Sequence, residues 1–132
     1  MRGRFAIVLA VGVVLSAPLF AHHGSAAFDN GKTIVLKGTV AQWVYSNPHC
    51  LLTVDVKGED GKVIQWIAET QAPNIMYPAG YRKNSFKIGD EVTVTVEPVK
   101  NGLPIGRIRE VVLANGTTLG GIASVPVSPK GQ

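Results

Sequence analysis

The chain has 132 residues, a formal net charge of +4 and a single cysteine, Cys50. A chain of this length forms one small domain, and one cysteine cannot form an intramolecular disulfide. The positive charge is too small to indicate a nucleic-acid partner, because domains that bind polyanions are strongly basic.

The first 21 residues have the pattern of a secretory signal peptide. The basic start "MRGR" precedes the uncharged apolar run "FAIVLAVGVVLSAPLFA", which ends at the small residue Ala21. This order of basic, apolar and small residues is typical of a cleaved export signal. The run is also short for a membrane span of roughly 20 residues, although a retained anchor is the alternative. We predict cleavage after Ala21, export to the periplasm, and no membrane attachment of the mature chain.

Strand-like patterns fill the domain that we expect over residues 33–120, after an N-terminal arm at 22–32. β-branched and aromatic residues predict strands separated by short turns. The predicted strands are "TIVLKGTVAQWVY" (33–45), "HCLLTVDVK" (49–57), "VIQWIAET" (63–70), "EVTVTVEPV" (91–99) and "LPIGRIREVVLANGTTL" (103–119), the last being one strand or a pair. The turns between them contain "SNP", "GEDGK", "GD" and two "NG" pairs.

One segment breaks this alternation. "QAPNIMYPAGYRKNSF" (71–86) contains two prolines and a glycine, and predicts one or two short helical turns after the third strand. Five strands with a short helical insert at that point predict an all-β fold, a small OB-like five-stranded barrel. A β-sandwich is the alternative. Residues 121–132 are rich in Gly, Pro and Ser and predict a disordered tail.

Several stretches together resemble a family of small exported bacterial proteins that is classed as a domain of unknown function. They are "AHHGSAAFD", "GTVAQWVYSNPHCLLTVDV" and "SFKIGDEVTVTVEPVKNG", and the resemblance runs from Ala21 to Leu119. It implies an exported protein with a β-barrel, and it implies no settled activity.

Two histidines follow directly on the predicted cleavage site. Cleavage there gives His22 a free α-amino group beside its imidazole, and His23 adds a second imidazole. Such nitrogen-rich donor sets suit Cu(II), and the α-amino group titrates near neutrality, so that copper displaces its proton at modest cost. Phe28 is expected to dock on the barrel and hold the arm, with Asp29 starting a turn. The alternative is that the arm is only a polar leader.

The third histidine, His49, follows the predicted "SNP" turn and lies at the start of a strand. If the arm folds back over the end of the barrel, His49 joins His22 and His23 in one copper site. The alternative is a hydrogen bond from its imidazole to the backbone of the turn. Cys50 is expected on the opposite side of the strand as a buried apolar residue, with a Cu(I) site as the alternative.

Aromatic and basic residues offer a function of a different class. They suggest an OB-like module that binds a partner protein or a small ligand without metal, through the set Trp43, Tyr45, Tyr81, Arg82 and Lys83. Simple packing of the rings and a solvated loop are the alternatives. The sequence contains no recognised catalytic motif, so we do not expect an enzyme, although a small copper oxidase remains a third hypothesis.

Overall fold

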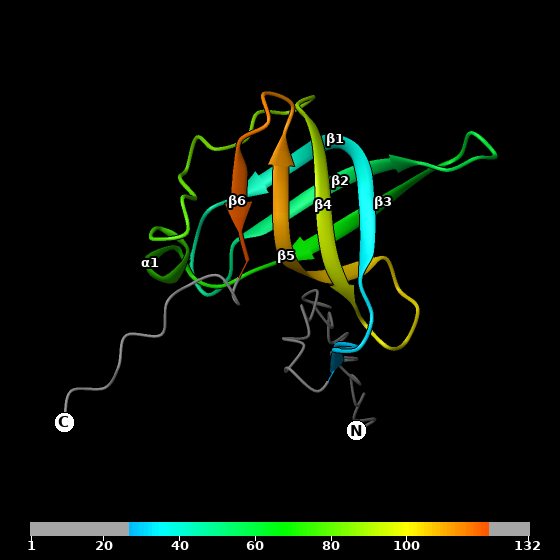
Figure 1. Ribbon diagram of the computed structural model, residues 1–132, viewed down its shortest axis with the longest axis horizontal. Coiled ribbons are helices and arrows are strands. Elements are labelled where there is room, and N and C mark those ends of the chain that lie inside the picture. The colour runs from blue at the N-terminus through cyan, green and yellow to red at the C-terminus, as the bar shows by residue number, and fades with distance from the viewer. Residues whose placement is uncertain (1–26, 122–132) are drawn as a thin grey trace, which may run out of the picture.

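The computed structural model describes residues 27–121, and within this range the protein is an all-β domain with one short helical piece (Figure 1). The predicted signal peptide, His22, His23 and the predicted disordered tail from residue 122 onward lie outside the described residues. The elements are β1 (Ile34–Val44), β2 (Leu51–Lys57), β3 (Val63–Glu69), α1 (Pro73–Met76), β4 (Glu91–Pro98), β5 (Ile105–Leu113) and β6 (Thr118–Gly120). No helix in this range is long and apolar enough to cross a membrane.

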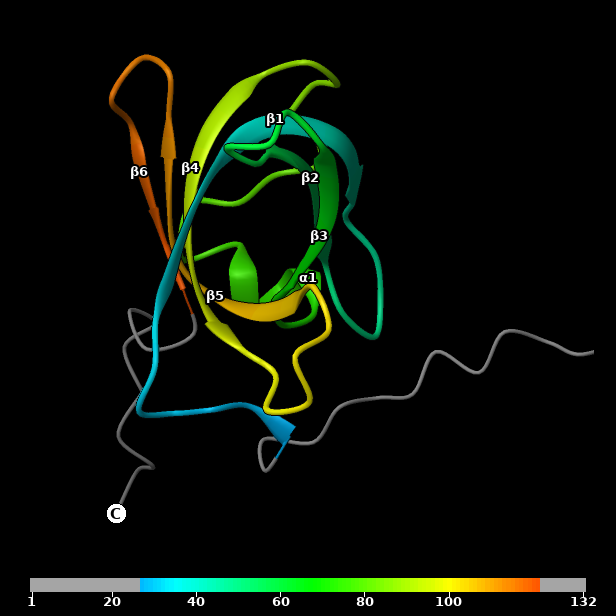
Figure 2. The same ribbon diagram turned by 90° about the vertical axis from the view of Figure 1, so that its right-hand side faces the viewer.

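Five of the strands close into a barrel. The sheet has the order β3-β2-β1-β4-β5-β6, and β3 also pairs in parallel with β5. This additional pairing joins the two ends of the sheet, and the strands form a ring in Figure 2. The structure therefore confirms the OB-like barrel predicted from the sequence, not the sandwich. The "NG" turn at 115–116 separates β5 from β6, so the last segment is a pair of strands.

Every second side chain of these strands points inward and helps to fill the interior of the barrel. Leu52, Val54 and Ala68 are fully buried, as are Val94 and Val96 of β4. Ile64 lies on the same face as Ala68, but the β2–β3 hairpin extends away from the barrel and leaves Ile64 largely exposed (Figure 1). Residues of one face of β3 thus become less buried toward the tip of the hairpin.

β1 bends where Gly38 lies between β2 and β4. A Cβ atom at this position would collide with the backbone oxygen of Asp55, so a side chain does not fit. The bulge in the pairing with β2 lies slightly further along, between Val40 and Gln42. Close approach of two backbones at a glycine explains how the long strand pairs with β2 at one end and β4 at the other.

The short helix α1 covers one end of the barrel (Figure 2). Pro73 occupies its first turn, where a missing N–H costs nothing, and Met76 is fully buried. The chain then returns to β4 through a loop that buries Tyr81 and Phe86. The predicted helical turns after the third strand are therefore present as a single turn.

The described part of the N-terminal arm packs against the far end of β4. Phe28 is only 3% exposed and forms an isolated bridge with Val99. The Asp29 N–H donates to the Pro98 oxygen at 2.8 Å, and the Lys100 N–H donates to the Ala27 oxygen at 3.0 Å. Docking of Phe28 on the barrel is thus confirmed. The predicted turn is present too, because Lys32 N–H donates to the Asp29 oxygen at 3.1 Å.

Candidate functional site

His49 lies beside two acceptor groups at the end of β3. Its Nδ1 is 2.8 Å from the backbone oxygen of Thr70 and 3.1 Å from Oε1 of Glu69. The side chains of His49 and Glu69 are 32% and 15% exposed, so the pair lies at the surface but is partly shielded. The segment is held in place because the Cys50 N–H donates to Gln71 and the Thr70 N–H donates to Cys50.

These contacts require a proton on Nδ1 of the imidazole ring. A backbone carbonyl only accepts hydrogen bonds, so Nδ1 must carry a proton and donate it. In the neutral ring the lone pair then belongs to Nε2. Histidines that bind metals commonly have this arrangement, in which a carbonyl or carboxylate accepts from one nitrogen and the other nitrogen binds the metal. The ring of His49 is therefore oriented as a ligand would be.

The backbone acceptor beside Nδ1 of His49 does not belong to the turn that the sequence offered as the alternative to a metal site. The sequence pattern suggested the "SNP" turn at 46–48, whereas the acceptor is Thr70, just beyond the end of β3. The turn stands next to His49 in the sequence, but β2 and β3 are antiparallel, and their pairing brings Thr70 opposite Cys50. The contact is therefore tertiary and could not be read from neighbouring residues.

A second polar cluster lies on the outer face of β4 and β5. Glu97 is only 2% exposed, and two arginines surround its carboxylate. Arg107 donates to Oε2 through Nε at 3.0 Å and through a terminal nitrogen at 2.5 Å, while Arg109 donates to Oε1. Burial alone would raise the pKa of Glu97, but the hydrogen bonds and charges of the two arginines outweigh it and lower that pKa.

Sequence reasoning did not find this cluster. Glu97 follows three inward-facing valines in β4, and the two arginines lie in "RIRE" of β5, which reads as an ordinary alternating strand. Only the pairing of Glu97 with Arg107 across the β4–β5 ladder brings the charges together. The available signal was an acidic residue between Val96 and Pro98 near the end of the strand, since such a residue needs a partner when it is buried.

Arg107 connects this cluster to the N-terminal arm and to β3. Its guanidinium donates to Oδ1 of Asn30 at 2.9 Å and lies 4.9 Å from the centre of the Phe28 ring. On its other side, Arg107 pairs in register with Glu69 of β3. A continuous row of residues therefore runs from the arm across β5 to the His49–Glu69 pair.

The predicted aromatic platform is packed into the protein. The Trp43 ring lies against Tyr45, Tyr81 and Phe86, with its centroid 4.9 Å from that of Phe86. Its Nε1–H donates to the Arg82 oxygen at 3.0 Å, and the Tyr45 hydroxyl donates to the Pro73 oxygen at 3.2 Å. Tyr81 is fully buried, so it has no ring face to offer a ligand, unlike the platform expected at this position.

Arg82 and Lys83, the basic residues proposed beside these rings, have different surroundings from each other. Arg82 stacks over the Tyr77 ring at 3.4 Å and donates at 2.7 Å to the backbone oxygens of Tyr77 and Tyr81. Lys83 is exposed. The guanidinium of Arg82 thus ties the loop after α1 to itself, which is a structural role.

The buried hydroxyl of Tyr81 leads to a testable prediction. It has no hydrogen-bond partner in the part of the chain that the structure describes. Removing an unsatisfied buried hydroxyl relieves a desolvation cost, so Tyr81→Phe is expected to raise the free energy of unfolding by about 1 kcal/mol. Chemical denaturation of the two proteins measures this difference. The opposite sign is expected for Tyr45→Phe, which loses the bond to Pro73.

The same substitution should change the alkaline limit of stability. Burial raises the pKa of the Tyr81 hydroxyl above its ordinary range, and the nearby Cys50 and Glu110 add to this shift. The unfolded chain then ionises first, so the wild type loses stability as pH rises above about 10. In Tyr81→Phe this part of the loss should be absent. A pH profile with the same slope in both proteins would contradict the assignment.

Cys50 is fully buried, as predicted, whereas the side chain of the adjacent His49 is partly exposed. Burial raises the pKa of its thiol, and a backbone hydrogen bond involving Ser46 only partly offsets this. A raised pKa disfavours the thiolate, which is the form that reacts and binds metals. The structure therefore favours the reading of Cys50 as a core residue.

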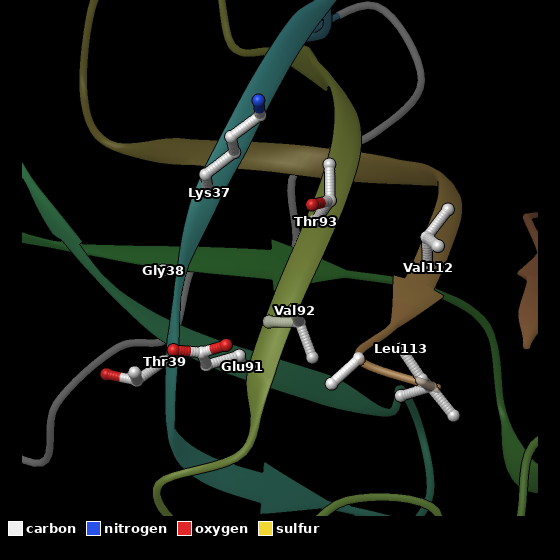
Figure 3. A pocket seen from close by; sticks show the side chains of 9 residues that line it. Lys37, Gly38, Thr39, Glu91, Val92, Thr93, Val112 and Leu113 are labelled. Atoms are coloured by element: carbon white, nitrogen blue, oxygen red, sulfur yellow. The ribbon is translucent and has the colours of Figure 1, made fainter. Parts of the chain in front are cut away.

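An open groove of about 470 Å³ lies on the outer face of β1, β4 and β5 (Figure 3). Its walls include Lys37, Thr39, Glu91, Thr93 and Val112. It lies at the start of β4, whereas Glu97 and the docked arm lie at the end of that strand. The groove contains no histidine or cysteine, and we assign it no chemistry.

Among residues 27–121, no three His, Cys, Asp or Glu side chains form a group that could hold a metal ion. Of the predicted copper ligands only His49 belongs to this range, and His22 and His23 lie outside it. A metal site that uses all three histidines therefore remains a prediction.

Comparison with known protein families matches residues 10–108 to DUF6152, a family of unknown function. The chain belongs to this family. No curated protein and no solved structure matches the chain. Membership in DUF6152 agrees with the resemblance to a family of unknown function, and function must be argued from the residues of this chain.

Proposed function

We propose that this DUF6152 protein is an exported, periplasmic copper-binding protein. Its signal peptide is removed after Ala21, and Cu(II) is bound by the α-amino group and imidazole of His22, by His23, and by Nε2 of His49. Four nitrogen donors of this kind match the ligand preference of Cu(II). No catalytic step is part of the proposal.

The orientation of His49 is the observation that carries this proposal. Its Nδ1–H is donated toward the Thr70 carbonyl and the Glu69 carboxylate, which leaves the lone pair on Nε2. Glu69 Oε1 lies 3.1 Å from Nδ1, where a carboxylate stands behind many metal-bound histidines. A histidine that served only to bond a carbonyl would not need the carboxylate as well.

The docked arm gives the second line of support. Phe28 fixes the chain against Val99, and residues 22–26 precede Ala27. An extended segment of this length spans at most about 17 Å. From Phe28, the row through Arg107 and Glu69 leads to His49, and neighbouring strands in such a row are about 4.8 Å apart. The reach of the segment is thus compatible with a site that includes all three histidines.

The alternative of a metal-free binding module has less support. It required exposed faces on Trp43, Tyr45 and Tyr81, whose polar atoms and rings are engaged within the fold or buried. Arg82 is likewise bonded to backbone oxygens. The His49–Glu69 pair therefore favours copper over a ligand that stacks on aromatic rings.

The intact mass of the exported protein tests the proposal. The full-length gene is expressed with its own leader, and the periplasmic product is measured with and without one equivalent of Cu(II). We expect a chain that starts at His22 and keeps one copper ion through buffer exchange. The control is the same product with both His22 and His23 replaced by alanine, which keeps a free amino terminus but removes the two imidazoles of the arm. A chain starting elsewhere, or copper lost equally from both proteins, would overturn the proposal.

A further inference from the structure

We propose that Arg107 is a positioning residue that holds the described part of the N-terminal arm, residues 27–32, through its contacts with Asn30 and Phe28. This inference rests on the proposed function only where copper is concerned, since the contacts themselves belong to residues 27–121. It gives the buried Glu97–Arg107–Arg109 cluster a purpose beyond the stability of β4 and β5.

The guanidinium of Arg107 is oriented from one side by Glu97. Two of its nitrogens donate to the same carboxylate oxygen, at 3.0 and 2.5 Å, and the carboxylate is almost completely buried. Arg109 binds the other oxygen of Glu97 and so prevents the carboxylate from turning. A planar guanidinium with such a partner is pre-organised and presents its remaining donors and its face in fixed directions.

The other side of the guanidinium faces the arm. The nitrogen that donates to Glu97 at 2.5 Å also donates to Asn30 at 2.9 Å, and the cation lies 4.9 Å from the centre of the Phe28 ring. One side chain therefore contacts both Phe28 and Asn30. An arginine whose only task was to neutralise Glu97 would not need to contact a segment 77 residues away in the sequence.

Fixing the arm at Phe28 has a consequence for the metal site. Tethering a ligand group by a short linker gives it an effective concentration in the millimolar range or above at a nearby site. If Phe28 and Asn30 are released, the tether becomes longer and this local concentration falls. Arg107 would then strengthen copper binding without touching the metal.

The experiment compares Arg107→Lys with the matched control Arg109→Lys. Both changes keep a positive charge beside Glu97, but it is Arg107 that donates to Asn30 and lies beside the Phe28 ring. Amide hydrogen exchange is followed by NMR at Asp29 and Lys100, whose N–H groups join the arm to the end of β4. The amide of Ile67, which donates to Pro104 within the barrel, reports global opening.

For Arg107→Lys we expect exchange at Asp29 and Lys100 to accelerate about tenfold relative to Ile67, which corresponds to the loss of one charge-assisted hydrogen bond. Arg109→Lys should leave this ratio unchanged. Asn30→Ala, a surface change that does not endanger folding, should shift the ratio in the same direction. Competition with a chelator should show weaker Cu(II) binding for Arg107→Lys and Asn30→Ala, and unchanged binding for Arg109→Lys.

The outcomes separate this inference from the proposed function. An unchanged exchange ratio in both Arg107→Lys and Asn30→Ala would overturn the positioning role, whatever copper does. If the exchange ratio increases in Arg107→Lys and Asn30→Ala but the wild type binds no copper, the anchoring role is supported and only the copper proposal is overturned. Equal losses of copper affinity in the Arg107 and Arg109 variants would mean that the cluster acts only through general stability, and would also overturn the inference.

Discussion

Replacing Glu97 by glutamine is expected to lower the free energy of unfolding by about 3 kcal/mol at pH 7, because it leaves two guanidinium groups without their shared carboxylate. The side chains of Arg107 and Arg109 are 19% and 32% exposed, so water relieves part of their unpaired charge. The expected loss therefore lies at the lower end of the range for broken buried ion pairs. It still exceeds the effect of an ordinary surface substitution several times over.

The loss should depend on pH in a defined direction. The arginines hold the pKa of Glu97 below its ordinary range in the folded protein. A carboxyl with a lowered pKa contributes stability that is present above the pKa of the unfolded state, about 4.3, and is lost as pH falls through the folded value. The difference between wild type and Glu97→Gln should thus be largest near pH 7 and should shrink below about pH 4.

Urea denaturation at pH 7 and at pH 3 measures both effects. The matched control is Glu91→Gln, the same chemical change on the same strand at an exposed position, which should alter stability by less than about 0.5 kcal/mol. A Glu97→Gln deficit that stays constant between the two pH values would mean that lost packing or a lost hydrogen bond, not the carboxylate charge, determines the effect.

The barrel could be predicted because its information is local. Alternation in "HCLLTVDVK" and "EVTVTVEPV" depends only on which face each residue occupies, and Leu52, Val54, Val94 and Val96 are buried as expected. Proline and glycine in "QAPNIMYPAG" likewise indicate the end of a strand and a helical turn by their own backbone preferences. The location of such elements follows from short-range patterns.

The polar contacts could not be predicted in the same way. Glu97 meets Arg107 and Arg109 because β4 pairs with β5, and Arg107 meets Asn30 because the arm returns to the end of β4. Trp43 and Tyr45 fit a binding surface by residue type alone, but in the fold α1 and the following loop provide the acceptors for their polar atoms. Each of these contacts depends on tertiary structure, which residue type and spacing do not encode.

His49 lies between these two cases. Its position at a strand start was evident from "SNPHC", but the choice between a structural hydrogen bond and a metal ligand was open. The structure contains the hydrogen bond, in which Nδ1–H of His49 donates to the Thr70 carbonyl. In the neutral ring the lone pair is then on Nε2. The two alternatives are therefore compatible, since the bond to Thr70 prepares the ring for the role proposed for it.

A double-mutant cycle on His49 and Glu69 tests that role. Glu69→Gln keeps the shape of the side chain but removes the charge behind the ring, and is expected to weaken Cu(II) binding about tenfold, the lower end for such supporting groups. His49→Ala removes the ligand itself and should weaken binding at least as much. Once His49 is absent, Glu69→Gln should have no further effect, because the carboxylate acts only through the imidazole.

Competition with a chelator measures the four affinities, and electron paramagnetic resonance counts the coupled nitrogens. We expect His49→Ala to lose one imidazole from the Cu(II) spectrum, whereas Glu69→Gln keeps the same nitrogen count with weaker binding. Glu91→Gln, on the exposed start of β4, serves as the control that should change neither quantity. Additive losses would make Glu69 a direct ligand or a structural residue. Full affinity in His49→Ala would remove His49 from the site and leave copper to the amino terminus alone, so the measurement decides whether the barrel takes part in binding.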